Sequence, residues 1–168
     1  SRNFGHLKGV QIIEKLVKYS IKLKIPILTF YTFSTENWKR PKNEIKFLFK
    51  LIDKYFKNEI KNLVKNSIKI NIIGNIHNLP KKIRSRLHNS MKLTKNCKKI
   101  VVNLAINYGS QNEIIETTKK LKNKNINVSV NNFEKNLFTK GQPNPDILIR
   151  TGGKKRLSNF LLWQLAYS

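Results

Sequence analysis

Two short segments of the chain collect side chains that suit the binding of phosphate groups. In the first, Arg150, Arg156 and Ser158 fall within nine residues, with Gly152 and Gly153 between them. Arg presents a planar fork of donors to phosphate oxygens, Ser adds a hydroxyl donor, and Gly lets the backbone approach an anion closely. The composition predicts an anion-binding turn, and a basic surface turn with a Ser cap is the alternative explanation.

The second segment follows an apolar stretch nearer the start of the chain. Residues 27–33 are apolar, β-branched and aromatic, which predicts a buried strand of a mostly parallel sheet. The residues that follow are Ser34, Thr35, Glu36, Asn37, Trp38, Lys39 and Arg40. Because open α/β sheets bind ligands at the carboxyl ends of their strands, this polar segment is a candidate site, and an ordinary polar loop is the alternative.

Strand and helix patterns alternate along the chain and place both segments at the ends of elements. We expect strands at 27–33, 68–73, 100–106 and 146–149, and helices at 9–22, 43–65, 80–93, 111–121, 133–138 and 158–167. The alternation predicts an α/β fold, with a mostly parallel central sheet flanked by helices in a single domain. A final helix beginning near Ser158 would add its amides and the positive end of its dipole to the anion-binding turn.

The chain is strongly basic, with 34 Lys and Arg against 9 Asp and Glu and a formal charge of +25. Such a charge suits nucleic acid or an anionic membrane surface as a partner. The lysines are spread out, however, and Lys, Asn and Ile all have AT-rich codons, so genome composition accounts for much of the excess. The sequence shows no RNA-recognition or helix-turn-helix signature, no apolar run long enough to span a membrane and no leader. Its lone Cys97 excludes an internal disulfide.

Four motifs, in order along the chain, resemble those of the cis-prenyltransferases, typified by undecaprenyl diphosphate synthase. Residues 33–41 are similar to the family's F-S-x-E-N-W-x-R-P signature, and residues 5–9 to its G-H-x-x-G. Residues 103–109 resemble N-x-A-x-N-Y-G, and residues 149–160 resemble I-R-T-x-G-E-x-R-x-S-N-F. The resemblance therefore extends over the whole chain.

The resemblance implies an enzyme that adds isopentenyl diphosphate units to an allylic diphosphate such as farnesyl diphosphate. The expected product is a long polyprenyl diphosphate, the lipid carrier for cell-wall glycan synthesis, and the expected cofactor is Mg²⁺. The family also implies a homodimer in the cytoplasm, in peripheral contact with the inner face of the membrane through its lipid product. We expect no nucleic acid as a partner.

The resemblance also implies roles for single residues. Asn37 matches a catalytic position, although an amide is a very poor base and the departing diphosphate is a more plausible proton acceptor. Trp38 is expected to pack over the prenyl chain or a neighbouring loop, and Glu44 to tether the loop. The residues expected to bind substrate are Arg2, His6, Ser34, Thr35, Glu36, Trp38, Arg40, Arg150, Arg156, Leu157 and Ser158.

The chain departs from the family pattern at three places. Lys154 stands where the motif has Glu, and the family's D-G-N-x-R-W segment and C-terminal Glu are not in the sequence. We therefore expect the metal ligands to lie outside residues 1–168, and this chain alone to be inactive. Asp53 and Asp146 are the only aspartates, so the sequence lacks the Asp-rich motif of trans-prenyltransferases. The alternatives are a catalytically silent fragment or partner subunit of the family, or a basic nucleic-acid-binding domain.

Overall fold

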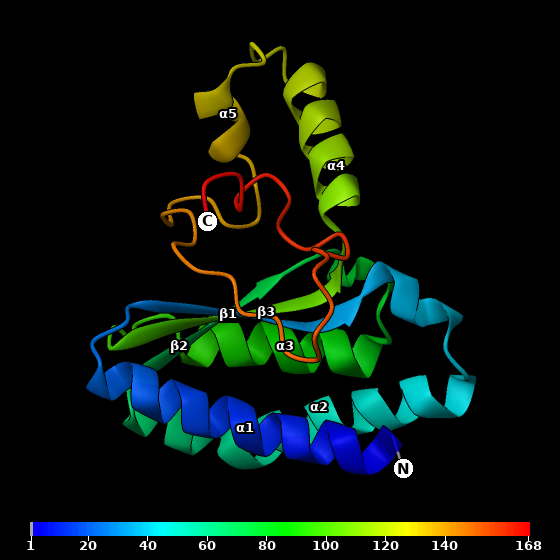
Figure 1. Cartoon of the computed structure of the whole chain (residues 1–168), viewed down its shortest axis with the longest axis vertical. Helices are drawn as coiled ribbons and strands as arrows, with labels where there is room; N and C mark the ends of the chain where they lie inside the picture. The colour runs from blue at the N-terminus through cyan, green and yellow to red at the C-terminus, as the bar shows by residue number, and fades with distance from the viewer. Residues whose placement is uncertain (1) are drawn as a thin grey trace. The chain divides into compact units, whose positions relative to one another are not determined.

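The computed structural model describes the backbone of residues 2–168 and the side chains of residue 5 and residues 8–168. Figure 1 shows the chain, whose contacts divide it into two units, Ser1–Asn107 and Tyr108–Ser168. Each unit is described by itself. Arg2 and His6, two of the predicted ligands, have side chains outside the described set.

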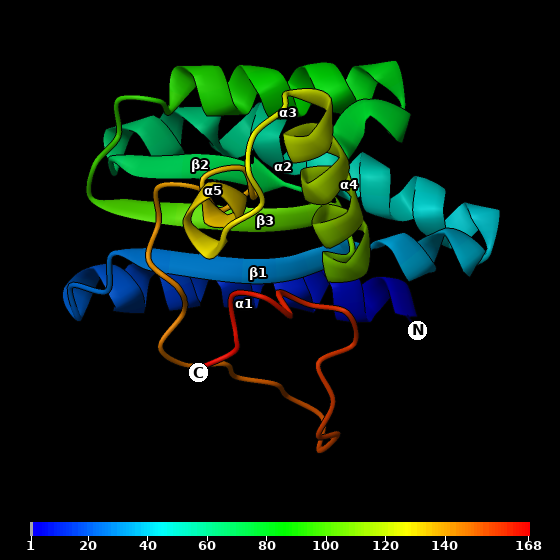
Figure 2. The ribbon, with the colours of Figure 1, turned by 90° about the horizontal axis from the view of Figure 1, so that it is seen from above.

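The first unit holds a three-stranded sheet with helices against it. Its elements are α1 Arg2–Lys22, β1 Ile27–Ser34, the 3₁₀ helix η1 Thr35–Lys39, α2 Lys42–Lys65, β2 Ile68–Ile73, the 3₁₀ helix η2 Ile76–Asn78, α3 Lys81–Leu93 and β3 Ile100–Tyr108. The strand order is β1-β3-β2, and β2 pairs in parallel with β3 from Ile68 opposite Ile100 to Ile73 opposite Ala105. Figure 2 shows β3 between the other two strands. The predicted parallel α/β fold is confirmed.

One hydrophobic core joins the sheet to the helices of this unit. Alternate residues of β3 (Val102, Leu104 and Ile106) are buried on the face that packs against α2 and α3. The apolar stripe of α2 contributes Leu48 and Phe49 to the same cluster, because residues three and four apart share one face of a helix. This stripe is therefore mainly core packing.

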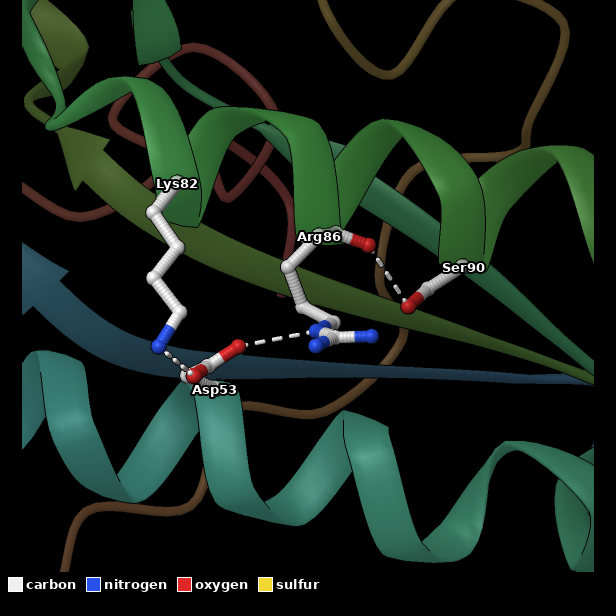
Figure 3. A network of polar contacts seen from close by, with 4 residues as sticks. All are labelled: Asp53, Lys82, Arg86 and Ser90. Atoms are coloured by element: carbon white, nitrogen blue, oxygen red, sulfur yellow. Dashed lines mark hydrogen bonds and ion pairs between the residues drawn. The ribbon is translucent and has the colours of Figure 1, made fainter.

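Helices α2 and α3 are also joined by an ion-pair network. Asp53 of α2 lies 2.8 Å from Lys82 Nζ and 2.8 Å from Arg86 Nε, both on α3 (Figure 3). Ser90 donates from its hydroxyl to the backbone carbonyl of Arg86 at 2.9 Å. One carboxylate thus holds two cations that are one helical turn apart.

A ladder of amide and hydroxyl groups crosses the three strands. Asn71 Nδ2 donates to Asn103 Oδ1 at 2.8 Å, and Asn103 Nδ2 donates to Thr29 Oγ1 at 3.0 Å. Asn103 is only 1% exposed, so its amide would be costly to bury without these partners. The ladder satisfies it from both sides.

The second unit is organised around a buried carboxylate. It contains α4 Ser110–Asn123 and α5 Val130–Glu134. Glu113 of α4 is 2% exposed and accepts from the hydroxyl of Tyr108 at 2.6 Å and from the backbone N–H of Phe138 at 2.7 Å. Gln164 Nε2 also donates to Glu113, at 3.2 Å. This one carboxyl group therefore connects three separate parts of the unit by hydrogen bonds.

Four predicted elements differ from the structure. The strand predicted at 146–149 is irregular, because Pro143 and Pro145 precede it and its isoleucines are 75% and 83% exposed. The helix predicted at 158–167 is a series of turns, since three of its residues have φ near +50°, which a right-handed helix excludes: Ser158, Asn159 and Leu161. The short helix predicted at 133–138 lies earlier, at Val130–Glu134, where Ser129 caps it by accepting from Asn132 N. Helix α1 begins at Arg2 rather than residue 9, because glycine lowers helix stability without preventing a helix.

Candidate functional site

The polar segment after β1 is a short 3₁₀ helix whose start is fixed by Asn37. The Asn37 side-chain carbonyl accepts from the backbone N–H of Ser34 at 3.1 Å. Next to it, Thr35 donates from its hydroxyl to Glu36 Oε2 at 3.3 Å. The carbonyl of Asn37 therefore has a structural partner at the start of η1. The expected contact of Asn37 with a substrate stays a prediction.

Trp38 ties this segment to the central strand. Its indole N–H donates to Asn107 Oδ1 at 2.8 Å, and its ring meets Phe33 edge-on with centroids 5.3 Å apart. Phe49 of α2 contacts the same ring at 5.7 Å. Trp38 is 40% exposed. Its ring therefore contacts the neighbouring side chains and remains partly open to solvent. These contacts pack Trp38 against neighbouring elements, and its expected contact with a prenyl chain stays a prediction.

Asn107 brings the carboxyl ends of all three strands together. Its backbone is left-handed, with φ of 50°, and its Nδ2 donates to the backbone carbonyl of Asn75 at 2.6 Å. The backbone N–H of Asn75 donates back to the carbonyl of Asn107 at 3.2 Å. Next to Asn75, Gly74 has φ of 122°, and an added Cβ would lie 2.2 Å from the carbonyl oxygen of Ile106. Only glycine fits this approach.

An ion pair and a half-buried tyrosine flank the segment. Arg40 Nη1 lies 2.8 Å from Glu44 Oε1, one turn into α2, which agrees with the predicted tether. Tyr31 lies on β1 just before the segment, and burial raises the pKa of its hydroxyl to about 12, with a further contribution from the charge of Glu36. A hydrogen bond with Ser34 acts in the opposite direction. Tyr31 therefore stays protonated at neutral pH beside Ser34 and Glu36.

The second predicted site is a basic loop of residues 150–158. Arg150 Nη1 donates to Ser158 Oγ at 2.9 Å and also to the backbone carbonyl of Arg156. Gly152 and Gly153 have φ of 92° and 69°, and no heavy atom would lie within 4 Å of a Cβ on either one. The loop is thus closed at its base by Arg150 and open around its glycines.

The outer part of the basic loop carries the other predicted ligands. Arg156 is exposed and Leu157 is 40% exposed. Lys154, which departs from the family motif, is also exposed. No helix begins at Ser158, so the predicted contribution of a helix dipole here is wrong. The loop offers guanidinium, ammonium and backbone groups to an anion without that dipole.

Sequence reasoning missed what the residues after Ser158 do. The backbone carbonyl of Asn159 accepts from Ser110 N and its Oδ1 accepts from Gln111 N, both at 2.8 Å. These are amides of the first turn of α4, which need partners from outside the helix. Phe160 meets Tyr108 edge-on at 6.3 Å. The S-N-F letters of the motif were the available signal, but they do not reveal a cap supplied from so far along the chain.

A metal site does not form among the described residues. No group of three or more His, Cys, Asp or Glu side chains converges in that part of the chain. Glu44 pairs with Arg40, Asp53 with α3, and Glu113 is enclosed by hydrogen bonds. In the same part of the chain, no helix is long and apolar enough to cross a bilayer.

A parallel sheet with a polar segment at the carboxyl ends of its strands is the arrangement in which open α/β proteins bind ligands. The second unit contains a basic glycine loop of its own. Comparison with known proteins makes this specific. The family model described as "Putative undecaprenyl diphosphate synthase" matches residues 1–168. The chain is 44% identical over 174 residues to an isoprenyl transferase of Prochlorococcus marinus, covering 99% of this chain and 64% of that protein.

Two solved structures share the fold. A probable undecaprenyl diphosphate synthase from Campylobacter jejuni matches with a TM-score of 0.87 and 38% identity, over 95% of this chain and 76% of that one. Lavandulyl diphosphate synthase from Lavandula x intermedia, in complex with dimethylallyl diphosphate, matches with a TM-score of 0.92 and 30% identity, over 98% and 74%. The chain belongs to the undecaprenyl diphosphate synthase family, a family of prenyltransferase enzymes.

Proposed function

We propose that this chain is part of a cis-prenyltransferase that adds isopentenyl diphosphate to an allylic diphosphate. The observation that carries the proposal is the basic loop: in a member of this family, Arg150 and Ser158 lie 2.9 Å apart at the base of a loop that exposes Arg156. A diphosphate needs several cationic and neutral donors converging on adjacent oxygens. The loop supplies both kinds from one short segment.

The reaction breaks the C1–O bond of the allylic diphosphate and forms a bond from the alkene carbon of isopentenyl diphosphate to C1. A proton then leaves the condensed product, which gives the new double bond. We assign the departing diphosphate as its acceptor, because Asn37 is an amide whose carbonyl already accepts from Ser34 N. Asn37 is then a positioning residue that holds the segment after β1.

The remaining predicted ligands divide between the two substrates. We assign Arg150, Arg156, Leu157 and Ser158 to isopentenyl diphosphate, and Arg2, His6 and Arg40 to the allylic diphosphate. Arg40 is held toward α2 by Glu44, which fixes its direction. The allylic class is supported by the relative crystallised with dimethylallyl diphosphate.

Mg²⁺ does not fit the described carboxylates, because no three potential ligand side chains converge among the described residues. In enzymes that release diphosphate, such an ion neutralises the leaving group. We keep it as a proposed cofactor of the whole protein, with ligands other than the carboxylates described here.

The names of the relatives support a finer proposal. We infer that residues 1–168 form one isoprenyl transferase domain and that the product is a long polyprenyl diphosphate carrier for cell-wall glycans. We also infer a homodimer in the cytoplasm, in peripheral contact with the membrane. The chain spans 64% of the Prochlorococcus relative, so these statements concern the whole protein of which such a domain is part.

Titration calorimetry with isopentenyl diphosphate tests the assignment of the basic loop. Arg156→Ala removes charge-assisted hydrogen bonds and should weaken binding about 10- to 100-fold. Lys122→Ala removes an exposed cation on α4 and is the matched control, expected to bind as the parent does. Equal affinity of Arg156→Ala and the parent would remove the loop from the substrate site.

Turnover needs a separate assay. Radiolabelled isopentenyl diphosphate, farnesyl diphosphate and Mg²⁺ should give extractable lipid product with a longer polypeptide that contains this sequence. Binding of isopentenyl diphosphate without any lipid product would favour the silent-subunit alternative.

A further inference from the structure

Helix α1 carries a row of exposed apolar side chains that the proposed chemistry does not use. Ile12, Leu16 and Tyr19 of α1 are 52%, 46% and 64% exposed, and Leu23, which directly follows the helix, is 71% exposed. They recur every three or four residues, so they form one continuous stripe, the apolar ridge. The buried side of the same helix is made by other residues, among them Val17 and Ser20.

A second row, of lysines, runs beside the apolar ridge. Lys8, Lys15, Lys18 and Lys22 are all exposed, and we call them the lysine ridge. At 3.6 residues per turn, the centres of the two ridges lie roughly 90° apart around the helix axis. Lys22 Nζ lies 5.6 Å from the centre of the Tyr19 ring, which joins the two rows at their C-terminal end. Glu14 is the only acidic residue in α1.

The position of α1 leaves both ridges accessible. The helix (blue in Figures 1 and 2) lies at one edge of the helix layer of its unit, with β1 above it. Exposed apolar side chains scattered singly are ordinary on protein surfaces, but four in a row beside four cations are not. An apolar stripe flanked by lysines is the pattern of a helix that lies in the plane of a membrane surface.

We propose that α1 binds the headgroup region of an anionic lipid bilayer, with the apolar ridge inserted and the lysine ridge on the lipid phosphates. Charge complementarity decides between the candidate occupants. A second copy of the chain would bring two lysine ridges together with one Glu14 on each side to offset them. Nucleic acid would pair with the lysines and leave the apolar ridge in water. An anionic bilayer satisfies both rows at once.

This inference rests on the membrane contact proposed above and assigns that contact to one helix. The surface needs neither substrate nor product, so a failure of its test would leave the proposed activity unaffected. The probes are vesicles of phosphatidylglycerol and phosphatidylcholine in equal parts and vesicles of phosphatidylcholine alone, sedimented with the chain in the absence of diphosphates. We expect binding to the first kind only, and weaker binding as salt rises. Equal binding to both kinds of vesicle would overturn the proposal.

Two triple variants separate the contribution of the lysine ridge from that of the apolar ridge. Lys15→Gln, Lys18→Gln and Lys22→Gln together should lower the partition coefficient about 100-fold. Leu16→Gln, Tyr19→Gln and Leu23→Gln together should lower it about 30-fold with the charge unchanged. Glutamine is a good helix former, so α1 should persist, which circular dichroism checks.

Matched controls come from other helices. Lys57→Gln, Lys61→Gln and Lys65→Gln remove three exposed lysines from α2, and this variant should bind within about threefold of the parent because these residues are not part of the lysine ridge. The proposal fails if the α1 and α2 lysine variants lose binding equally. It also fails if the apolar variant still binds vesicles but changes from dimer to monomer in sedimentation velocity, because the ridge would then be a subunit interface.

Discussion

At the scale of single residues, asparagine side chains connect the ends of elements. Asn37 accepts from the backbone at the start of η1, Asn107 joins Trp38 to Asn75, and Asn159 caps α4. Each amide offers a donor and an acceptor on a short stem, and asparagine tolerates the left-handed backbone that two of these positions adopt. The asparagines in the family motifs therefore hold the strand and helix ends in place.

Trp38→Phe tests the connection at the strand ends. The change keeps an aromatic ring against Phe33 and Phe49 but leaves Asn107 Oδ1 without the indole donor. We expect the free energy of unfolding to fall by about 1–2 kcal/mol, as measured by urea denaturation. Trp38→Ala should lose more, because it also removes the packing. A Trp38→Phe protein as stable as its parent would mean that water replaces the indole without cost.

At the scale of elements, the pairing of α2 with α3 depends on one carboxylate. Hydrogen bonds from Lys82, and next from Arg86, hold the pKa of Asp53 below its ordinary value. A carboxyl group with a lowered pKa in the folded state contributes stability above the pKa of the unfolded chain. That contribution is lost as the pH falls through the lower folded-state pKa.

Asp53→Asn should therefore change how stability depends on pH. The variant should be less stable than its parent by about 1–2 kcal/mol at neutral pH, with the difference shrinking below about pH 4. Urea midpoints from pH 7 to pH 3 give the measurement. The exposed Lys119–Glu116 pair, at 3.5 Å, provides the control Glu116→Gln, expected to stay within about 0.5 kcal/mol of the parent. A constant Asp53→Asn difference down to pH 3 would contradict the ion-pair explanation.

The turn after β2 rests on a close backbone approach to β3. Gly74→Ala would place a Cβ against the carbonyl oxygen of Ile106 and force alanine into a φ of 122°. We expect a loss of about 2–4 kcal/mol in the free energy of unfolding. Gly141→Ala, at φ of 77° with open space around the Cβ, separates strain from collision and should lose only about 1 kcal/mol. Equal losses at the two glycines would show that the approach to Ile106 relaxes easily.

At the scale of the whole molecule, a formal charge of +25 opposes compactness. Repulsion among like charges weakens as salt screens them, so the free energy of unfolding should rise between about 20 and 300 mM NaCl. Thermal unfolding at both salt concentrations measures it. Sulfate and chloride at equal ionic strength screen charges alike, so any extra stability in sulfate reports anion binding at the basic loop. Arg156→Ala should reduce that extra stability and leave the general effect of salt unchanged. A fall in stability with added NaCl would contradict the repulsion argument.

The sequence predicted the regular elements of the first unit well. Strand 68–73 and the helix at 43–65 lie where their apolar patterns placed them, because a single periodicity with one buried face determines each. The segment 146–149 carried an apolar pattern too, but its prolines and exposure leave it irregular. A strand also needs a neighbouring strand to pair with, and the apolar pattern of 146–149 does not show whether one is present.

The candidate site was predictable as a set of residues but not as a set of contacts. The motifs pointed to Trp38 and Asn107 separately, while the hydrogen bond between them joins positions 69 residues apart. The turns at 158–167 were mistaken for a helix because left-handed φ values have no reliable signature outside glycine. The partners of Glu113 come from three segments and have no sequence pattern at all.

The amide ladder across the sheet has a consequence for how the chain folds. In the native register Asn71 lies opposite Asn103. If β2 and β3 paired two residues out of alignment, the same faces would still point the same way, but Asn71 would meet Val101 or Ala105. The hydrogen bond between Asn71 and the buried Asn103 would then be lost, at a cost of about 1–3 kcal/mol. We therefore expect these two asparagines to disfavour misaligned pairing of β2 and β3 while the chain folds.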